Sequence, residues 1–239
     1  MNPARLFALP GTLLDGRSLA ALWPGREAQT LILGEAGTLD EEVDRLAEHA
    51  AGPAVWLGHS LGGIVALHLA LRHPDKVAAL VLLGANARAG RDSSEARRAA
   101  QWALAQEQGL SALARSKLAP GYGLTPGQDN DDALLASLAA QAEAVGLRRF
   151  KHQLVYARQR PGLLAPRRRL SCPVLAMSGD LDSLCPPAQS DEIVALVAPP
   201  HAARHHRLAG AGHLFPMQQA APVAALMHRF LADLKETCA

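Results

Sequence analysis

The sequence lacks the features that mark secreted, membrane and metal-binding proteins. Its three cysteines, Cys172, Cys185 and Cys238, are odd in number and show no C-x-x-C spacing, which argues against a disulfide framework and a zinc site. We interpret all three as thiols. No apolar run approaches the roughly 18 residues of a membrane span, and residues 1–5 lack the basic and apolar parts of a signal peptide. These absences predict a soluble, cytoplasmic protein with no membrane partner.

Cofactor motifs are missing as well. The chain contains no phosphate loop and no dinucleotide fingerprint, so we expect no cofactor. His201, His205 and His206 lie close together in the sequence, but no acidic partner completes a metal-ligand spacing, and we expect no metal. The net charge of +2 is too modest to argue for a nucleic-acid partner.

Six short apolar runs without an alternating pattern stand out along the 239 residues. Such runs are typical of strands buried on both faces of a parallel sheet. The chain is 49% hydrophobic and 19% charged, as in an ordinary globular protein with one core. The predicted strands are Arg5–Leu9, Thr30–Leu33, Ala54–Leu57, Val77–Leu83, Pro173–Met177 and Arg204–Leu208.

Helical patterns separate several of these strands. They cover Leu39–Ala50, Leu61–Arg72, Pro187–Val197 and Met217–Lys235. The alternation of strand and helix predicts an α/β fold with an open, mainly parallel sheet of about six strands flanked by helices. Because functional groups gather at the carboxyl ends of the strands in such sheets, we expect the chemistry in the loops at those ends.

The alternation stops between residues 86 and 168, where the chain is rich in Ala, Leu, Gln and Arg. We predict a helical lid here, inserted into a core formed by residues 1–85 and 169–239. The expected helices of the insertion are Ser94–Gln108, Ser111–Leu118, Asp131–Ala144 and Leu147–Arg160, with breaks at Pro120–Gly121 and Thr125–Gly127.

A G-x-S-x-G motif, Gly58–Gly62, follows a predicted strand and opens a predicted helix. In this position the motif is typical of a nucleophilic serine on a strained turn, where the helix N-terminus supplies N–H groups and a positive dipole end. The structural alternative is a glycine-rich turn that only packs well or binds a phosphate. Ser60 is therefore the candidate nucleophile.

A serine hydroxyl is a poor nucleophile unless a base takes its proton. His213 follows the last predicted strand in a loop of small residues, and it is the candidate base. The alternatives are less suitable, since His205 and His206 fall within that strand and His59 adjoins Ser60.

An acid must orient this histidine. Asp180 and Asp182 both follow the preceding strand, at the same edge of the sheet, and either residue could serve. The chain order of serine, acid and histidine agrees with the order that accompanies a G-x-S-x-G elbow, and it differs from the orders of chymotrypsin and subtilisin.

Acyl transfer also needs two N–H donors for the developing oxyanion. Leu61, directly after the candidate nucleophile, supplies the first. The second is expected from the loop after the first strand, where Gly11 permits a tight turn. Thr12 is the preferred donor and Leu13 the alternative.

Together these residues resemble the α/β-hydrolase superfamily over nearly the whole chain. The matching segments are Leu9–Gly11, with Pro10 in place of the family's His, the elbow Gly58–Gly63, His73–Val77, Ser178–Asp182 with Pro186 soon after, and Gly210–Met217. The family's G-x-x-D pattern implies that Asp182 is the acid and His213 its partner. Because the oxyanion loop arrives by residue 11, two strands of fuller members are expected to be absent. The size and helical insertion are most similar to small carboxylesterases such as the pimeloyl carrier-protein methyl ester esterases.

Charge is unevenly distributed. Residues 86–170 contain 14 Lys and Arg against 7 Asp and Glu, or +7, which leaves −5 for the rest of a chain with a net charge of +2. A basic lid over an acidic body would attract an anionic substrate, such as a carboxylate-bearing ester, a coenzyme A thioester or an acyl group on an acidic carrier protein. A solvated helical surface is the structural alternative.

The resulting prediction is a serine hydrolase that cleaves a small-molecule ester or thioester through a Ser60, His213 and Asp182 triad, with Leu61 and Thr12 as oxyanion donors. The same triad would also permit acyl transfer or carbon–carbon bond hydrolysis. A non-catalytic ligand-binding member of the fold is the alternative from another class. The oligomeric state is not determined by the sequence.

Overall fold

The fold was analysed in a computed structural model, which describes residues 5–23, 28–90, 95–119, 131–165 and 168–237. Cys238, the predicted helix start at Ser94 and the predicted breaks at residues 120–121 and 125–127 lie outside these ranges. No helix in the described ranges combines the length and the apolar character needed to cross a bilayer.

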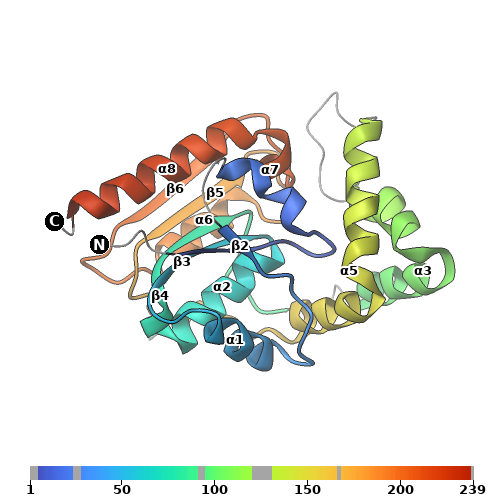
Figure 1. The fold of residues 1–239 in the computed structure, drawn as a ribbon, viewed down its shortest axis with the longest axis horizontal. Coiled ribbons are helices and arrows are strands. Elements are labelled where there is room, and N and C mark those ends of the chain that lie inside the picture. Colours follow the sequence, from blue (N-terminus) through green and yellow to red (C-terminus); the bar gives the residue numbers. More distant parts are fainter. Residues whose placement is uncertain (1–4, 24–27, 91–94, 120–130, 166–167, 238–239) are drawn as a thin grey trace.

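Six parallel strands form one sheet in the order β2-β1-β3-β4-β5-β6, which confirms the predicted α/β fold class (Figure 1). The strands are β1 (Leu6–Leu9), β2 (Ala28–Thr30), β3 (Ala54–His59), β4 (Val77–Leu83), β5 (Val174–Gly179) and β6 (Ala203–Leu208). Since all strands run in one direction, their carboxyl ends meet at one edge of the sheet, and the loops after β1, β3, β5 and β6 lie close together there.

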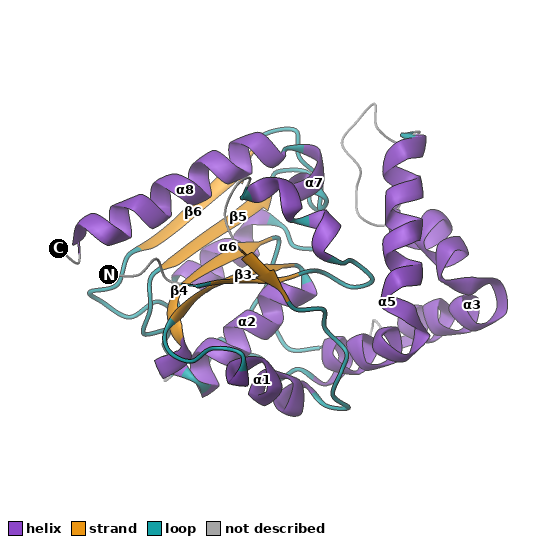
Figure 2. Ribbon diagram, viewed as in Figure 1, coloured by secondary structure: helices purple, strands orange, loops and turns teal. Residues whose placement is uncertain are grey.

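Helices cover both faces of the sheet (Figure 2). One face packs against α1 (Leu39–Glu48), α2 (Leu61–Arg72) and α6 (Pro187–Val194), and the other against α8 (Ala220–Thr237). Along β3, Trp56 contributes to the first apolar cluster and Leu57 to the second, as the alternation of side chains in a strand requires. Burial on both faces explains why the central strands are apolar without interruption.

Several predicted bounds differ from the structure by one to three residues, and the second strand and the last helix differ in a further way. The second strand is Ala28–Thr30 rather than Thr30–Leu33, because Leu31 and Leu33 are buried against the α1 and α2 face after the strand has ended. The predicted helix Met217–Lys235 is divided into α7 (Phe215–Gln218) and α8 by Gln219, whose backbone is not helical. Pro222 lies in the first turn of α8, where its missing N–H leaves no hydrogen bond unmade.

Between β4 and β5 the described residues form two long helices, α3 (Glu95–Leu113), which continues into a π-helical turn at Ala114–Leu118, and α5 (Asp132–Gln159). Each predicted pair of shorter helices is joined end to end through a glycine, Gly109 in α3 (φ 86°, ψ 167°) and Gly146 in α5 (φ 80°, ψ 160°). Only glycine adopts this backbone conformation readily, so each helix kinks at that residue.

The two helices share a third apolar cluster with the loops at the carboxyl edge of the sheet. Leu113 and Phe150 from the helices pack with Leu13 and Leu14, which follow β1, and with Leu214, which follows β6. The helices of the insertion are therefore packed directly against the loops that carry the candidate site residues.

Candidate active site

Ser60 occupies a sharp turn between β3 and α2, with φ 52° and ψ −116°. A positive φ is unfavourable for a residue with a side chain and costs about 1–3 kcal/mol. The turn is held by close packing at two glycines, since a Cβ on Gly58 would lie 2.5 Å from the Gly62 carbonyl carbon and a Cβ on Gly62 would lie 1.9 Å from the Leu9 oxygen. The Ser60 N–H donates to the Leu83 carbonyl at 2.9 Å. The side chain is therefore lifted out of the strand and is partly exposed.

His213 lies in the loop between β6 and α7, and its ring joins the other two predicted residues. Nε2 lies 2.9 Å from Ser60 Oγ, and Nδ1 lies 2.7 Å from Asp182 Oδ2. With Asp182 ionised, Nδ1 donates to the carboxylate and Nε2 is left to accept the serine hydroxyl hydrogen. The imidazole is buried, with 1% of the residue exposed, so bulk water does not compete for these contacts.

Asp182 is held as a carboxylate by His213 and by two backbone N–H groups. Burial alone would raise its pKa, but the hydrogen bond and charge of His213, together with the N–H groups of Leu184 and Cys185, outweigh burial and lower the pKa. Asp180, the other acid of the loop, accepts the Ala211 N–H at 3.1 Å and ties the two loops together. Of the two acids, it is Asp182 that lies beside His213.

Gly84, the residue after β4, provides room for this pair and was missed in the sequence. Its φ is +54°, and an added Cβ would lie 3.2 Å from Asp182 Oδ2 and from His213 Nδ1. A single glycine after a strand is too common a signal to be distinguished without the fold.

His59 is a second residue whose role the sequence did not indicate. Its Nε2–H donates to the His213 carbonyl at 3.0 Å, and the two rings lie 5.1 Å apart. Burial lowers the His59 pKa to about 3, with the charge of His213 acting in the same direction, so the ring is neutral near pH 7. His59 thus anchors the backbone of the loop that carries His213.

The loop after β1 lies against the elbow, since a Cβ on Gly11 would lie 3.2 Å from the Ser60 Cβ. Thr12 and Leu61 both line the cavity beside Ser60. The Leu13 N–H, the alternative oxyanion donor, instead donates to Gln153 Oε1 of α5 at 2.9 Å, and Leu13 adopts φ 56°. Leu13 is therefore engaged elsewhere, and Thr12 lines the cavity next to the elbow.

Two buried glutamines of α5 hold this loop, and the sequence did not indicate either. Gln153 Oε1 accepts the Leu13 N–H while its Nε2 donates to the Leu33 carbonyl, and Gln141 Oε1 accepts the Asp15 N–H. Nothing in the local pattern distinguishes them from surface glutamines, because the partners lie more than a hundred residues away.

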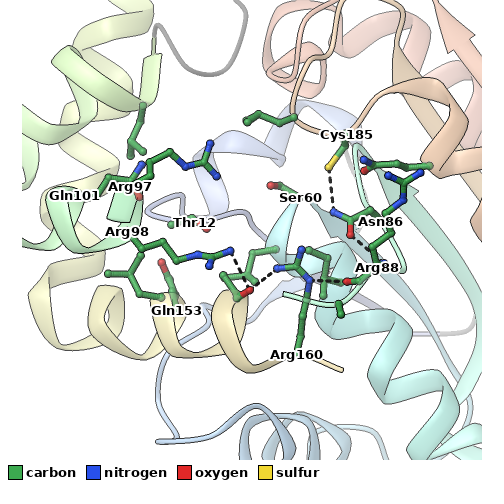
Figure 3. A pocket seen from close by; sticks show the side chains of 18 of the residues that line it. Thr12, Ser60, Asn86, Arg88, Arg97, Arg98, Gln101, Gln153, Arg160 and Cys185 are labelled. Carbon is green, nitrogen blue, oxygen red and sulfur yellow. Dashed lines mark hydrogen bonds between the residues drawn. The ribbon is translucent and has the colours of Figure 1, made fainter. Parts of the chain in front are cut away.

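A cavity of about 400 Å³ opens beside Ser60, between the elbow and the insertion (Figure 3). Gln101 of α3 and Gln153 of α5 line one side of it, and on the other side Asn86 Nδ2 donates to Cys185 Sγ at 3.5 Å. Burial raises the Cys185 pKa to about 12, so this thiol is not a competing nucleophile. Among the described residues, no cluster of three or more His, Cys, Asp or Glu side chains could hold a metal ion.

A second Ser-His-Asp chain exists elsewhere in the molecule. Ser178 Oγ lies 2.8 Å from His205 Nε2, and His205 Nδ1 lies 2.7 Å from Asp191. Ser178 has no exposed surface, and it is not among the residues that line the cavity. This chain secures the edge strand β6 to β5 and α6, and it offers no room for a substrate.

The model of the α/β hydrolase fold family matches residues 35–220. The chain belongs to this family. Among curated relatives, the pimeloyl-[acyl-carrier protein] methyl ester esterase of Vibrio vulnificus strain YJ016 is 31% identical over 166 residues, which cover 63% of this chain and 60% of the relative. The esterase of the same name from Vibrio cholerae is 47% identical over 51 residues, which cover 21% of this chain and 20% of the relative. The match to the first relative thus spans less than two thirds of its length.

Solved structures of this family superpose on nearly the whole chain. A thermophilic esterase from Thermogutta terrifontis has a TM-score of 0.82 at 20% identity, covering 97% of this chain and 90% of the esterase. The enol-lactonase from Burkholderia xenovorans LB400 has a TM-score of 0.80 at 21% identity, covering 96% and 92%. At this identity the likeness shows the fold alone, and it agrees with the family model.

Proposed function

We propose that this α/β hydrolase is a serine hydrolase that cleaves a carboxylic ester or thioester through an acyl-enzyme. The observation that carries the proposal is the unbroken hydrogen-bonded chain from Ser60 Oγ through His213 to Asp182, which ends at a cavity large enough for a small substrate. The esterase names of the curated relatives support a carboxylic ester as the bond that is cleaved.

In the first half-reaction, Ser60 Oγ attacks the carbonyl carbon while its proton passes to His213 Nε2. Asp182 holds the ring in the tautomer that can accept this proton, and it stabilises the imidazolium that forms. Collapse of the tetrahedral intermediate breaks the bond to the alcohol or thiol, which leaves with the proton from Nε2. The acyl group then remains on Ser60.

In the second half-reaction, a water molecule attacks the acyl carbon and gives a proton to His213 Nε2, which returns it to Ser60 Oγ as the acid is released. The Leu61 and Thr12 N–H groups act as the oxyanion donors in both steps. Every proton and electron pair in this cycle is accounted for by the protein, the ester and water, so the reaction calls for no cofactor.

We further propose that residues 86–168 act as a lid on a core made of residues 1–85 and 169–239. In support, residues of α3 and α5 line the cavity, and Gln153 of α5 holds the loop that carries Thr12. A lid in this position would limit the access of water to the acyl-enzyme.

The test is active-site labelling with a fluorophosphonate, followed by intact-mass measurement. We expect one adduct on the wild type and on Ser178→Ala, and none on Ser60→Ala, because among the serines that the structure describes only Ser60 has both a hydrogen-bonded base and an open cavity. Ser178→Ala is a matched control, since it removes the hydroxyl of the other Ser-His-Asp chain. Turnover of a p-nitrophenyl ester should follow the same pattern.

The folded state of each variant is checked by its melting temperature. Ser60→Ala should melt at or above the wild-type temperature, while Ser178→Ala loses a buried hydrogen bond and should be destabilised by about 1 kcal/mol. Labelling or turnover that survives in folded Ser60→Ala would falsify the proposal.

A further inference from the structure

The cavity beside Ser60 is lined by four arginines, Arg88, Arg97, Arg98 and Arg160, and by no Asp or Glu among the described residues. Figure 3 shows Arg97 and Arg98 entering from α3 on one side and Arg88 on the other, with Arg160 between them. The other polar residues of the lining are uncharged, and they include Thr12, Gln101 and Gln153. Such a lining would favour a negatively charged ligand.

The arginines differ in how they are held. Arg88 forms a two-pronged ion pair with Glu192, which offsets its charge. Arg160 donates to the carbonyl oxygens of Ala157 and Arg88 at 2.6 and 3.0 Å, and Arg98 donates to the Ala157 carbonyl at 3.2 Å. Carbonyl oxygens orient a guanidinium without cancelling its charge, so these contacts help to set the positions of the two guanidiniums.

Arg97 forms no hydrogen bond or ion pair with any residue in the described part of the chain, and its neighbour Arg98 lies half-buried. Burial lowers the pKa of Arg98, the positive charges of Arg97 and Arg158 lower it further, and Glu95 opposes them. An anion bound between these two guanidiniums would relieve their repulsion and make charge-assisted hydrogen bonds with them.

Three arginines of α5 that do not line the cavity are offset differently. Arg148 and Arg149 of α5 both pair with Glu35, and Arg158 pairs with Glu95. These three arginines thus have carboxylate partners within the chain. Arg97, in contrast, reaches the cavity that contains Ser60 and has no such partner in the described part of the chain, so its charge is available to a ligand bound there.

We propose that the cavity binds a small ester whose acyl chain ends in a carboxylate, held by Arg97 and Arg98 while the ester carbonyl lies at Ser60. This inference rests on the proposed function, since it assigns the substrate class of the same site. Planar guanidiniums bind a carboxylate through paired hydrogen bonds, and a cavity of about 400 Å³ accommodates a short dicarboxylic half-ester.

The experiment compares p-nitrophenyl half-esters of dicarboxylic acids with p-nitrophenyl esters of monocarboxylic acids of equal carbon number. The measured quantity is the ratio of kcat/KM for the charged ester to that for the neutral one, across chain lengths. For the wild type we expect a ratio of about ten or more at the best length, because hydrogen bonds to a charged group are among the stronger ones.

Arg97→Gln and Arg98→Gln should each lower this ratio by about tenfold. Arg148→Gln is the matched control, because it removes the same charge from the outer face of α5, where the side chain is 62% exposed, and it should keep the wild-type ratio. A uniform fall of the ratio in all three variants would overturn the proposal in favour of a general field effect.

The outcomes separate this inference from the proposed function. Turnover of neutral esters with a ratio near one overturns the carboxylate site and leaves the hydrolase proposal standing, whereas absent labelling at Ser60 sinks the hydrolase proposal itself. A third outcome would favour protein docking. In that case the ratio is near one, the wild type rapidly hydrolyses the same ester when it is attached to an acidic carrier protein, and Arg148→Gln loses this activity.

Discussion

Ser60 and Ser178 each contact a histidine that is hydrogen-bonded to an aspartate, yet the surroundings of the two serines differ. Ser178 lies within β5 and is fully buried, whereas Ser60 is forced out of its strand by a backbone turn at positive φ. The turn is possible because Gly58 and Gly62 leave space that a Cβ would fill. At the scale of single residues, access and backbone strain distinguish the two serines.

A substitution at Asp182 tests the role of the acid. Asp182→Asn places an amide opposite His213 Nδ1, which favours the ring tautomer whose Nε2 already carries a hydrogen and cannot accept the serine proton. We expect kcat to fall by roughly 10³–10⁴-fold, and His213→Ala to cost still more.

The measurement is steady-state kinetics on a p-nitrophenyl ester, with melting temperatures to show that each variant is folded. Asp180→Asn is the control, since Asp180 contacts the Ala211 N–H and not His213, and it should retain most of the wild-type kcat. An Asp182→Asn enzyme with nearly full kcat would show that the acid is not needed.

At the scale of elements, the strands and the helices of the core follow local sequence patterns closely, and the insertion follows them only in part. β4 and α2 occupy the predicted ranges. Both elements are largely buried, so their continuous apolar sequences mark them clearly. In the region between β4 and β5, each predicted pair of helices meets at a glycine, Gly109 or Gly146, whose backbone is not helical, and no loop separates the two helices. A glycine between two helical patterns does not by itself distinguish a kink from a loop.

Gly146 gives an element-scale prediction whose sign opposes helix propensity. Alanine is a better helix former than glycine by about 1 kcal/mol, but at φ 80° and ψ 160° an alanine is strained by about 1–3 kcal/mol. Gly146→Ala should therefore lower the free energy of unfolding, although a Cβ there would meet no atom within 4 Å.

Urea unfolding of Gly146→Ala and Gly52→Ala decides this point. Gly52 also has open space around an added Cβ, and its φ is not in the left-handed range, so Gly52→Ala should be neutral or stabilising by about 0.4–1 kcal/mol. Equal or greater stability of Gly146→Ala would mean that the kink straightens at no cost.

At the scale of the whole molecule, the sheet brings together residues that are far apart in the chain. His59 and the His213 carbonyl are 154 positions apart, and Leu13 and Gln153 are 140 positions apart. Burial of histidines also affects how the stability of the whole fold responds to pH. His59 and His68 are both buried, and burial keeps both rings neutral in the folded state near pH 7.

His68 on α2 supplies a pH prediction for folding. Burial lowers its pKa from 6.5 to about 4, and its Nε2 has no partner within the described part of the chain. Between these two values the unfolded chain holds a proton that the folded chain does not, so the free energy of unfolding falls as the pH falls from 6.5 to about 4. The slope from one such group is at most about 1.4 kcal/mol per pH unit.

His68→Leu removes this contribution and should flatten the pH dependence of stability over that range. Urea unfolding across the range measures it, and the contribution of His59, which has the same sign, is common to both proteins and cancels in the difference. Parallel curves for the two proteins would show that His68 does not titrate as its burial implies.

The sequence by itself determined the succession of strands and helices along the chain, the elbow with Ser60 and the loop that carries His213. These features depend on local patterns and on chain order. It left Asp180 and Asp182 equivalent until the resemblance to a family distinguished them. The tertiary structure places Asp182 beside His213, and it alone decided which N–H of the β1 loop is engaged by Gln153 and which arginines line the cavity. Each of these contacts joins segments that are adjacent only after the parallel strands have paired, and a local pattern carries no information about such pairing.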